Sequence, residues 1–227
     1  MTSQEFADQL DARIAKYDLL CHPFYKAWSE GKLTHNDLRE YAHQYYHHVD
    51  AFPSYLDEFA ARLPHGHLRH AVLANRDEES GADGSRCHAE LWLDFAEGMG
   101  GSRNPEAPRV AAVKNLISQF HEVAREGAPE EALAAFYAYE SQVPRVAQEK
   151  ARGLREIYGA DERTCGYFTL HATADVYHSN VWRRQLERIV EDNPGAEQHA
   201  LAAAEKAAKA LWNALDGIED TRISRAA

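Results

Sequence analysis

The sequence has few cysteines and no motif that would pair them. Three occur among the 227 residues, at Cys21, Cys87 and Cys165, and none belongs to a Cys-x-x-Cys motif. An odd number of widely spaced cysteines argues against a disulfide framework and favours a reducing compartment, so we expect a cytoplasmic protein. Cys87 directly precedes His88, but we expect an ordinary thiol there and not a metal ligand.

The sequence also lacks long apolar runs and an excess of basic residues. No apolar run approaches the ~20 residues that a membrane-spanning helix requires. The N-terminus lacks the basic and apolar segments of a secretory signal. Lysine and arginine total 25 against 36 aspartate and glutamate, a formal net charge of −11. This balance argues against binding to nucleic-acid phosphates or to anionic membranes, so we expect neither as a partner.

Runs of β-branched residues are scarce, whereas Ala, Leu, Glu, Arg and Gln dominate. This composition, together with the apolar periodicity, predicts helices throughout and an all-α, irregular bundle. No Pro/Gly/Ser-rich linker divides the chain, so we expect a single domain over residues 1–227. Helices are predicted over residues 3–20, 23–30, 35–62, 67–79, 85–99, 109–126, 130–158 and 162–191, and over a last segment that ends near residue 215.

Two details of this pattern are specific enough to test. Thr34, followed by Asp37, is the predicted N-cap of the helix over residues 35–62. Pro144 lies inside the helix predicted over residues 130–158 and should kink it. Residues 221–227 are expected to be loose.

Three potential metal ligands occur in one short segment, at His171, Asp175 and His178. Their spacing of i, i+4 and i+7 places all three on one stripe of a helix, because successive residues are about 100° apart. Large apolar neighbours such as Trp182 indicate that this helix is at least half buried, where unpaired polar groups are costly. The segment therefore favours a metal site over a plain polar helix face.

Two more clusters of acids and imidazoles lie upstream. Glu78 and His88 flank a loop that contains glycine, and Glu140 lies among the aromatic residues of Phe136-Tyr-Ala-Tyr-Glu140. Taken alone, the first pair is typical of a solvated helix end. Carboxylates and imidazoles that project inward from several helices nevertheless build dinuclear iron or manganese sites in bundles, and mixed ligation suits these metals. His43 and His47 are also four residues apart, but no acid shares their stripe, so we expect hydrogen-bonding or supporting roles for them.

Together these segments resemble a known family. The resemblance covers residues 11–215 and rests on four motifs: the segment over residues 22–33, which opens His22-Pro-Phe-Tyr25; Asp77-Glu-Glu79; Tyr139-Glu-Ser-Gln-Val-Pro144; and His171-x-x-x-Asp175-x-x-His178. The chain resembles the chlamydial protein associating with death domains and its bacterial relatives. These belong to the haem-oxygenase-like bundles, with the thiaminase-related and pyrroloquinoline-quinone synthase C families.

The resemblance implies a haem-oxygenase-like oxidase that binds two metal ions, Fe/Fe or Mn/Fe, and no haem. Such an oxidase uses O₂ and an external reductant, and a homodimer is expected. The six ligands implied by the resemblance are Glu78, His88, Glu140, His171, Asp175 and His178. The spacing from Glu78 to His88 is slightly longer than expected, which leaves Glu79 as a substitute for Glu78. Two divalent ions and three carboxylates would leave such a cage nearly neutral and tolerable in a low-dielectric core.

The resemblance further implies synthesis of para-aminobenzoate for folate biosynthesis from the enzyme's own side chains. Tyr25 would supply the ring, Lys150 the amino group, and Tyr41 would be a second tyrosine that relays a radical or an electron. Without the resemblance, these residues would be interpreted as a core aromatic, a surface lysine and helix packing. A lysine that donates nitrogen must be deprotonated, and burial lowers a lysine pKa in that direction.

Two alternatives remain open from the sequence. In the first, the same two metals oxidise a diffusible small molecule, such as an amino acid, a fatty acid or a precursor resembling pyrroloquinoline quinone, and Tyr25 and Lys150 are structural. In the second, the chain is a metal-free helical interaction protein, as the death-domain association in the family name suggests. Under that second reading the six predicted ligands would have no task.

Overall fold

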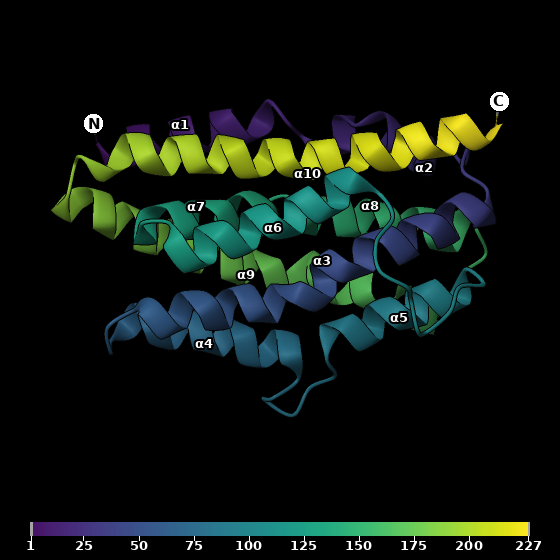
Figure 1. The fold of residues 1–227 in the computed structure, drawn as a ribbon, viewed down its shortest axis with the longest axis horizontal. Coiled ribbons are helices and arrows are strands. Elements are labelled where there is room, and N and C mark those ends of the chain that lie inside the picture. Colours follow the sequence, from purple (N-terminus) through teal and green to yellow (C-terminus); the bar gives the residue numbers. More distant parts are fainter. Residues whose placement is uncertain (1, 227) are drawn as a thin grey trace.

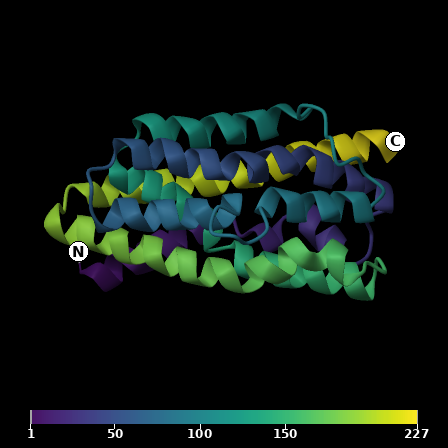
Figure 2. The same cartoon turned by 90° about the horizontal axis from the view of Figure 1, so that it is seen from below.

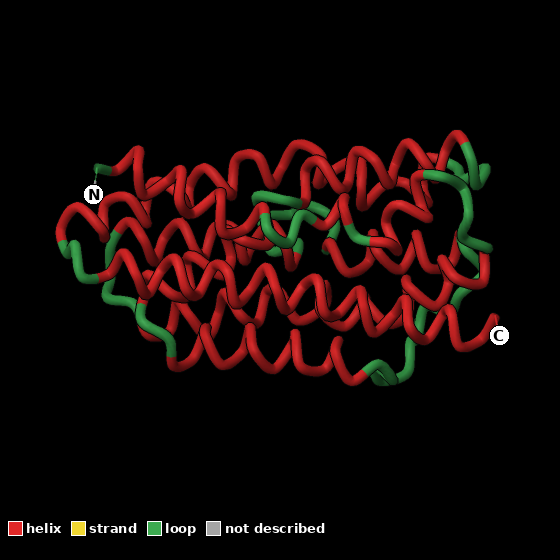
Figure 3. The backbone as a smooth tube through the Cα atoms, turned by 90° about the horizontal axis from the view of Figure 1, so that it is seen from above, coloured by secondary structure: helices red, strands yellow, loops and turns green. Residues whose placement is uncertain are grey.

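The computed structural model describes residues 2–226, which form helices joined by short loops and contain no β-strand (Figure 3). The elements are α1 (Ser3–Ala15), the 3₁₀ helix η1 (Leu19–Cys21), α2 (Pro23–Ser29), α3 (His35–Arg62), α4 (His67–Ser80), α5 (His88–Gly98), α6 (Ala111–Glu126), α7 (Pro129–Glu140), α8 (Val143–Glu156), α9 (Glu162–Asp192) and α10 (Ala196–Ala226). The predicted all-α class is confirmed. Within residues 2–226, no helix is both long enough and apolar enough to cross a membrane.

The helices form an elongated bundle with the two ends of the chain at opposite ends of its long axis (Figure 1). Helix α10 runs along almost the whole length of one side. On the other side, α4 and α5 lie end to end, joined by the loop over residues 81–87. Both of them pack against the long helices α3 and α9, which flank them when the bundle is seen from below (Figure 2). The site described below lies where α4, α5, α7 and α9 meet.

Local sequence signals determine where the helices that carry this site begin and end. Thr34 caps α3 as predicted, and its hydroxyl accepts a hydrogen bond from the backbone N–H of Asp37. Asp161 caps α9 in the same way. Gly81 ends α4 at a φ of +74°, and a Cβ there would lie 2.8 Å from the Ser85 carbonyl oxygen. Only glycine fits at this turn, which leads the chain into the loop before His88.

Three predicted helix boundaries are wrong. The first helix ends at Ala15, and the chain then forms η1. The predicted helix over residues 130–158 is broken and not merely kinked, because Pro144 lies in the first turn of the new helix α8. The last helix continues through residues 221–226, which were expected to be loose, because Ile218 is buried and Thr221 bonds back to the Gly217 carbonyl. Residue 227 lies outside the described residues.

The core is unusually aromatic around the middle of the bundle. Its largest fully buried side chains include Trp28, Trp92, Trp182, Tyr41 and Phe95. Burial of such rings provides most of the driving force for packing, at about 25 cal/mol per Å² of apolar surface. Polar and charged side chains are also buried there, and these define the candidate site.

Candidate metal centre and buried lysine site

Helix α9 presents His171, Asp175 and His178 to the interior on one stripe, as the sequence predicts. All three side chains are at most 3% exposed. They face carboxylates from two other helices and an imidazole from a third. The helix is buried along this stripe and exposed on the opposite face, where Tyr177 is 67% exposed.

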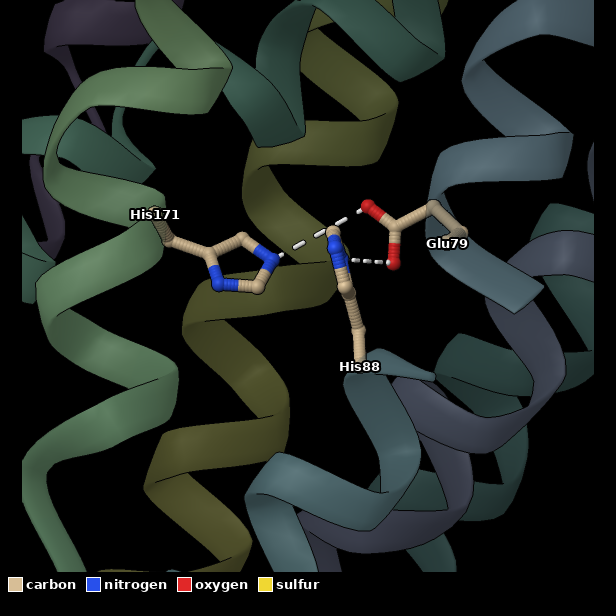
Figure 4. A group of neighbouring side chains, drawn as sticks. All are labelled: Glu79, His88 and His171. Carbon is tan, nitrogen blue, oxygen red and sulfur yellow. Dashed lines mark ion pairs between the residues drawn. The ribbon is translucent and has the colours of Figure 1, made fainter. Parts of the chain in front are cut away.

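The side chains of Glu79, His88 and His171 form one potential metal-binding group. Glu79 comes from α4, His88 from the start of α5 and His171 from α9, and both imidazoles lie against the Glu79 carboxylate (Figure 4). His88 Nδ1 is 2.7 Å from Glu79 Oε2, and His171 Nε2 is 3.8 Å from Glu79 Oε1. The two carboxylate oxygens therefore each face a different imidazole.

A second group shares Glu79 and adds Glu140, Asp175 and His178. His178 Nδ1 lies 3.6 Å from Glu140 Oε1 and 3.5 Å from Asp175 Oδ1. Glu140 is the last residue of α7, where that helix stops before the turn that leads to Pro144. Glu79 thus lies between two neighbouring groups, in the position that a carboxylate bridging two ions would take.

The structure brings five of the six predicted ligands into the two potential metal-binding groups, and Glu79 takes part in both groups in place of Glu78. Glu78 belongs to neither group, its side chain is 40% exposed, and its Oε2 accepts a hydrogen bond from His178 Nε2 at 2.9 Å. Neighbouring helical residues point about 100° apart, so only one of Glu78 and Glu79 can face inward. The geometry therefore favours the predicted substitute, Glu79, over the first choice, Glu78, for this position.

Residues outside the two groups hold the imidazoles and Glu140 in place. His171 Nδ1–H donates to the Tyr167 carbonyl at 2.8 Å, which turns Nε2 toward Glu79. Glu140 accepts hydrogen bonds from Asn75 Nδ2 at 2.8 Å and from Trp182 Nε1. Such outer hydrogen bonds set the tautomer and direction of a ligand. Sequence reasoning missed these partners, although Tyr167, Asn75 and Trp182 each lie four residues from a residue of the two groups.

Several buried polar atoms of these groups have no hydrogen-bond partner within the described part of the chain. They are His88 Nδ1, Asp175 Oδ1 and His178 Nδ1. His88 Nδ1 is close to Glu79, but that contact lacks hydrogen-bond geometry. Buried polar groups without partners are costly and rare, so three in one place need an explanation. A cation in each group would give these atoms a partner.

In the absence of a metal, protons must balance the carboxylates. Burial lowers the pKa of His171 and His178, but the nearby carboxylates outweigh this effect and raise the pKa to about 9 and about 10, respectively. Burial raises the pKa of Glu140 to about 8. The two groups therefore favour bound positive charge, which either protons or metal ions can supply.

A second buried site contains Tyr25, Tyr41 and Lys150. Lys150 Nζ lies 2.8 Å from the Tyr25 hydroxyl oxygen and also hydrogen-bonds the Tyr41 hydroxyl, and the two hydroxyl oxygens are 2.9 Å apart. Burial lowers the pKa of Lys150 well below 10.5 and raises the pKa of both phenols. The lysine is therefore buried, although the residues alone, without the resemblance, suggested a surface position.

Two further tyrosines separate this lysine site from the metal-binding groups. Tyr139 and Tyr167 line the cavity of about 20 Å³ that touches Tyr25 and Lys150. The same two tyrosines line the smaller void beside Glu79, His171 and Asp175. The two sites are therefore adjacent but are not in direct contact.

The remaining candidates lie away from both sites. His43 and His47 are on the exposed side of α3, where both Nε2 atoms contact the Glu106 backbone carbonyl, at 2.9 and 2.6 Å. This agrees with the hydrogen-bonding role expected of them. Cys87 is the residue before α5 and belongs to neither metal-binding group.

Comparison with known proteins identifies the family. Residues 39–212 match the family of iron-containing redox enzymes. The chain belongs to this family. An enzyme is thereby confirmed, and the donor set described above, with its unpartnered buried atoms, fits the iron that the family name implies.

Similar proteins include several synthases. The chain is 37% identical to 4-aminobenzoate synthase of Nitrosomonas europaea, over 97% of this chain and 93% of that protein. It is 36% identical to 4-aminobenzoate synthase of Chlamydia pneumoniae, over 95% and 94%, respectively. A pyrroloquinoline-quinone synthase of Granulibacter bethesdensis is 25% identical, over 96% and 86%. The resemblance stated from the motifs is therefore confirmed.

Solved structures confirm the haem-oxygenase-like fold. A domain with a heme oxygenase-like fold from Shewanella denitrificans superposes with a TM-score of 0.75 at 18% identity, over 96% of this chain and 90% of that one. A TenA homologue from Pseudomonas syringae also gives 0.75, at 15% identity, over 96% and 92%. At this identity the likeness concerns the fold alone.

Proposed function

We propose that this protein is a 4-aminobenzoate synthase that makes its product for folate biosynthesis from two of its own side chains. Tyr25 supplies the ring and Lys150 supplies the amino nitrogen. Two similar proteins of almost the same length bear the name of this activity. The observation that carries the self-consuming form of the proposal is the hydrogen bond between Lys150 and Tyr25, whose side chains are both buried.

The size of the cavity favours an internal ring donor over a diffusible one. Only about 20 Å³ is open beside Tyr25 and Lys150. This is room for about one water molecule, whereas small-molecule sites usually measure about 300–1,000 Å³. A cleft of about 410 Å³ exists elsewhere, but Arg39, His43 and their neighbours line it, and neither Lys150 nor the metal-binding groups reach it. A free amino acid or fatty acid has no place beside this lysine.

The geometry of the pair matches the substitution pattern of the product. A tyrosine ring carries its Cβ and its hydroxyl at opposite positions, and 4-aminobenzoate carries its carboxylate and amino group in the same way. Lys150 Nζ lies at the hydroxyl end of Tyr25. Attack there would place nitrogen opposite the carbon that becomes the carboxylate.

The protonation states suit a lysine that donates nitrogen. Burial lowers the pKa of Lys150 well below its usual range, which favours the neutral amine, whose nitrogen has the lone pair that a nucleophile needs. Burial also keeps the phenols of Tyr25 and Tyr41 protonated. The Tyr41 hydroxyl hydrogen-bonds both the Tyr25 hydroxyl and Lys150 Nζ, and so holds these two groups next to each other.

The two metal-binding groups would hold two ions, iron alone or manganese with iron. Glu79 would lie between them, with His88 and His171 on one ion and Glu140, Asp175 and His178 on the other. When bound, the ions supply the redox chemistry with O₂ and an external reductant, and haem has no part in the proposal. The surrounding aromatic core excludes water from the reaction.

The test uses isotopes built into the protein. The chain is produced with ¹³C-ring tyrosine and ¹⁵N-lysine, loaded with Fe(II) with and without Mn(II), and exposed to O₂ and reductant. The proposal expects 4-aminobenzoate that carries both labels, at no more than one molecule per chain, with matching mass losses in the peptides of Tyr25 and Lys150. Unlabelled product, or many turnovers on an added substrate, would favour the diffusible-substrate alternative.

Two conservative variants and two controls sharpen this experiment. Tyr25→Phe and Lys150→Arg should abolish the labelled product. Tyr177→Phe and Lys209→Arg make the same changes at exposed positions and should release it at wild-type yield. Wild-type yield from Tyr25→Phe would contradict the assignment of the ring donor.

A further inference from the structure

We propose that Trp92 relays an electron between Tyr41 and the candidate metal centre. This inference rests on the proposed function, since it explains how oxidation at the metal-binding groups reaches the Tyr25–Lys150 pair. The need for a relay follows from the two tyrosines that separate the sites. Tyr139 and Tyr167 line both cavities, whereas Tyr25 lines only the first, and residues of the metal-binding groups line only the second.

A continuous set of ring contacts crosses this gap. The Tyr167 ring stacks on the His171 imidazole, with centroids 3.9 Å apart. Trp92 meets Tyr167 edge to face at 4.8 Å, and on its other side lies 5.7 Å from the Tyr41 ring. The hydroxyl groups of Tyr41 and Tyr25 then form a hydrogen bond with each other. Trp92 is thus in ring contact with Tyr167, which stacks on His171, and with Tyr41, which lies beside Lys150.

The surroundings of Trp92 suit a group that transfers an electron and keeps its proton. The indole is 1% exposed, and its Nε1–H donates to the Ala42 backbone carbonyl at 2.8 Å. An amide carbonyl is too weak a base to remove the proton, so an oxidised indole here returns to its starting state by accepting an electron. Trp92 also lies one turn after His88 on α5, which places it on the same side of that helix as a candidate ligand.

The transfer balances in electrons and protons. Tyr41 gives up one electron, which passes through Trp92 and across the Tyr167 ring. The acceptor would be an ion held by the two metal-binding groups, for which O₂ is the oxidant. The O–H bond of Tyr41 breaks, and its proton forms a new N–H bond at Lys150 Nζ, which hydrogen-bonds that hydroxyl. Lys150 holds this proton only during the transfer and releases it before its nitrogen, with the lone pair restored, attacks Tyr25. Trp92 and Tyr167 end unchanged.

Trp28 provides a matched control. It is also buried and lies 5.7 Å from Tyr41, but its other ring contacts are to Phe95, Tyr158 and Phe168 and not to Tyr167. Trp28 therefore shares the aromatic environment and the contact with Tyr41 but reaches Tyr167 only through Phe168, whose ring is much harder to oxidise than that of tyrosine or tryptophan. A purely structural role for tryptophan here would make the two residues equivalent.

The experiment follows radical formation by freeze-quench electron paramagnetic resonance. The Fe(II)-loaded protein, with ordinary or ring-deuterated tyrosine, is mixed with O₂, and the tyrosyl signal is timed. We expect Trp92→Phe to slow the signal about tenfold or more, equivalent to at least ~1.4 kcal/mol in barrier. Trp92→Tyr, which keeps an oxidisable ring, should recover part of the rate, and Trp28→Phe should resemble wild type. Metal content and melting temperature are measured for every variant.

The outcomes separate the relay from the proposed function. A tyrosyl signal that forms in Trp92→Phe at the wild-type rate, with the same metal content, would overturn the relay. So would a wild-type protein that releases labelled 4-aminobenzoate without any tyrosyl signal. Absence of labelled product would instead overturn the proposed function, while the radical kinetics still decide the relay. Should Trp92→Phe lose its metals, replacement of the chain's four tryptophans by 5-fluorotryptophan, which is harder to oxidise, should slow the signal without removing a ring.

Discussion

The amino nitrogen of Lys150 lies 2.8 Å from the hydroxyl oxygen of Tyr25, deep in an aromatic core. The two residues are 125 positions apart in the chain. A lysine without a carboxylate partner is expensive to bury, and its pKa falls because burial disfavours the charged form. Such a cost is typical of a functional site.

This burial predicts a pH-dependent stability. In the unfolded chain Lys150 titrates near 10.4, whereas burial lowers its pKa well below that value in the folded protein, so between the two pKa values only the unfolded chain holds the proton. The unfolded state therefore binds more protons, and stability rises with pH up to about 10.4 by up to about 1.4 kcal/mol per pH unit. Lys150→Met should be more stable than wild type at pH 7, and its advantage should shrink as pH rises. Urea unfolding of both proteins at pH 7, 8 and 9 measures this, and a constant difference would contradict it.

Neighbouring glutamates should differ sharply in their effect on metal binding. Glu79→Gln removes the carboxylate shared by both groups and should abolish binding of at least one ion per chain. Glu78→Gln removes the negative charge beside His178 Nε2 but keeps an amide oxygen that can accept the same hydrogen bond, so it should weaken binding by no more than the about 10–100-fold that loss of an outer partner of a ligating imidazole costs. Metal analysis after Fe(II) loading and desalting, with titrations of each variant, provides the comparison. Equal losses, or a greater loss in Glu78→Gln, would restore Glu78 as the ligand.

Metal ions should stabilise the fold. One metal-binding group has donors from α4, α5 and α9 and the other from α4, α7 and α9, so ions in both groups would tie four helices together. Binding to the folded state alone adds about 2.7 kcal/mol when the free ion is at 100 times its dissociation constant. Fe(II) or Mn(II) under anaerobic conditions should therefore raise the melting temperature of wild type, and should raise that of His178→Ala less, because this variant loses a donor of one group and keeps the other group intact. No shift in wild type would count against the site.

The turn before His88 should tolerate no side chain at its first glycine. Gly81→Ala combines a positive φ with a Cβ 2.8 Å from the Ser85 carbonyl oxygen. The conformational part alone costs about 1–2 kcal/mol, and the contact adds to it. Gly84→Ala is the matched control, since it also has a positive φ, of +93°, but has open space around the new Cβ. Chemical denaturation should rank Gly81→Ala below Gly84→Ala, and metal loading should follow the same order because the loop positions His88.

The features that could be predicted from the sequence are those that depend on residues close together in the chain. Helix periodicity predicted that His171, Asp175 and His178 share one stripe, and Thr34 followed by Asp37 predicted a helix cap. Each of these patterns spans only a few residues. The last helix was harder to delimit. Its end depends on the burial of Ile218 against other helices, which no local pattern reports.

The sequence by itself therefore determined the helical class, the stripe on α9 and, through several motifs together, the family. Only the tertiary structure decided that Glu79 and not Glu78 faces the interior, because the rotation of α4 is set by its packing against α3 and α5. It alone placed Lys150 beside Tyr25, and Trp92 between Tyr41 and Tyr167. Such contacts join residues far apart in the chain, and they arise from how whole helices pack and not from any spacing along one of them.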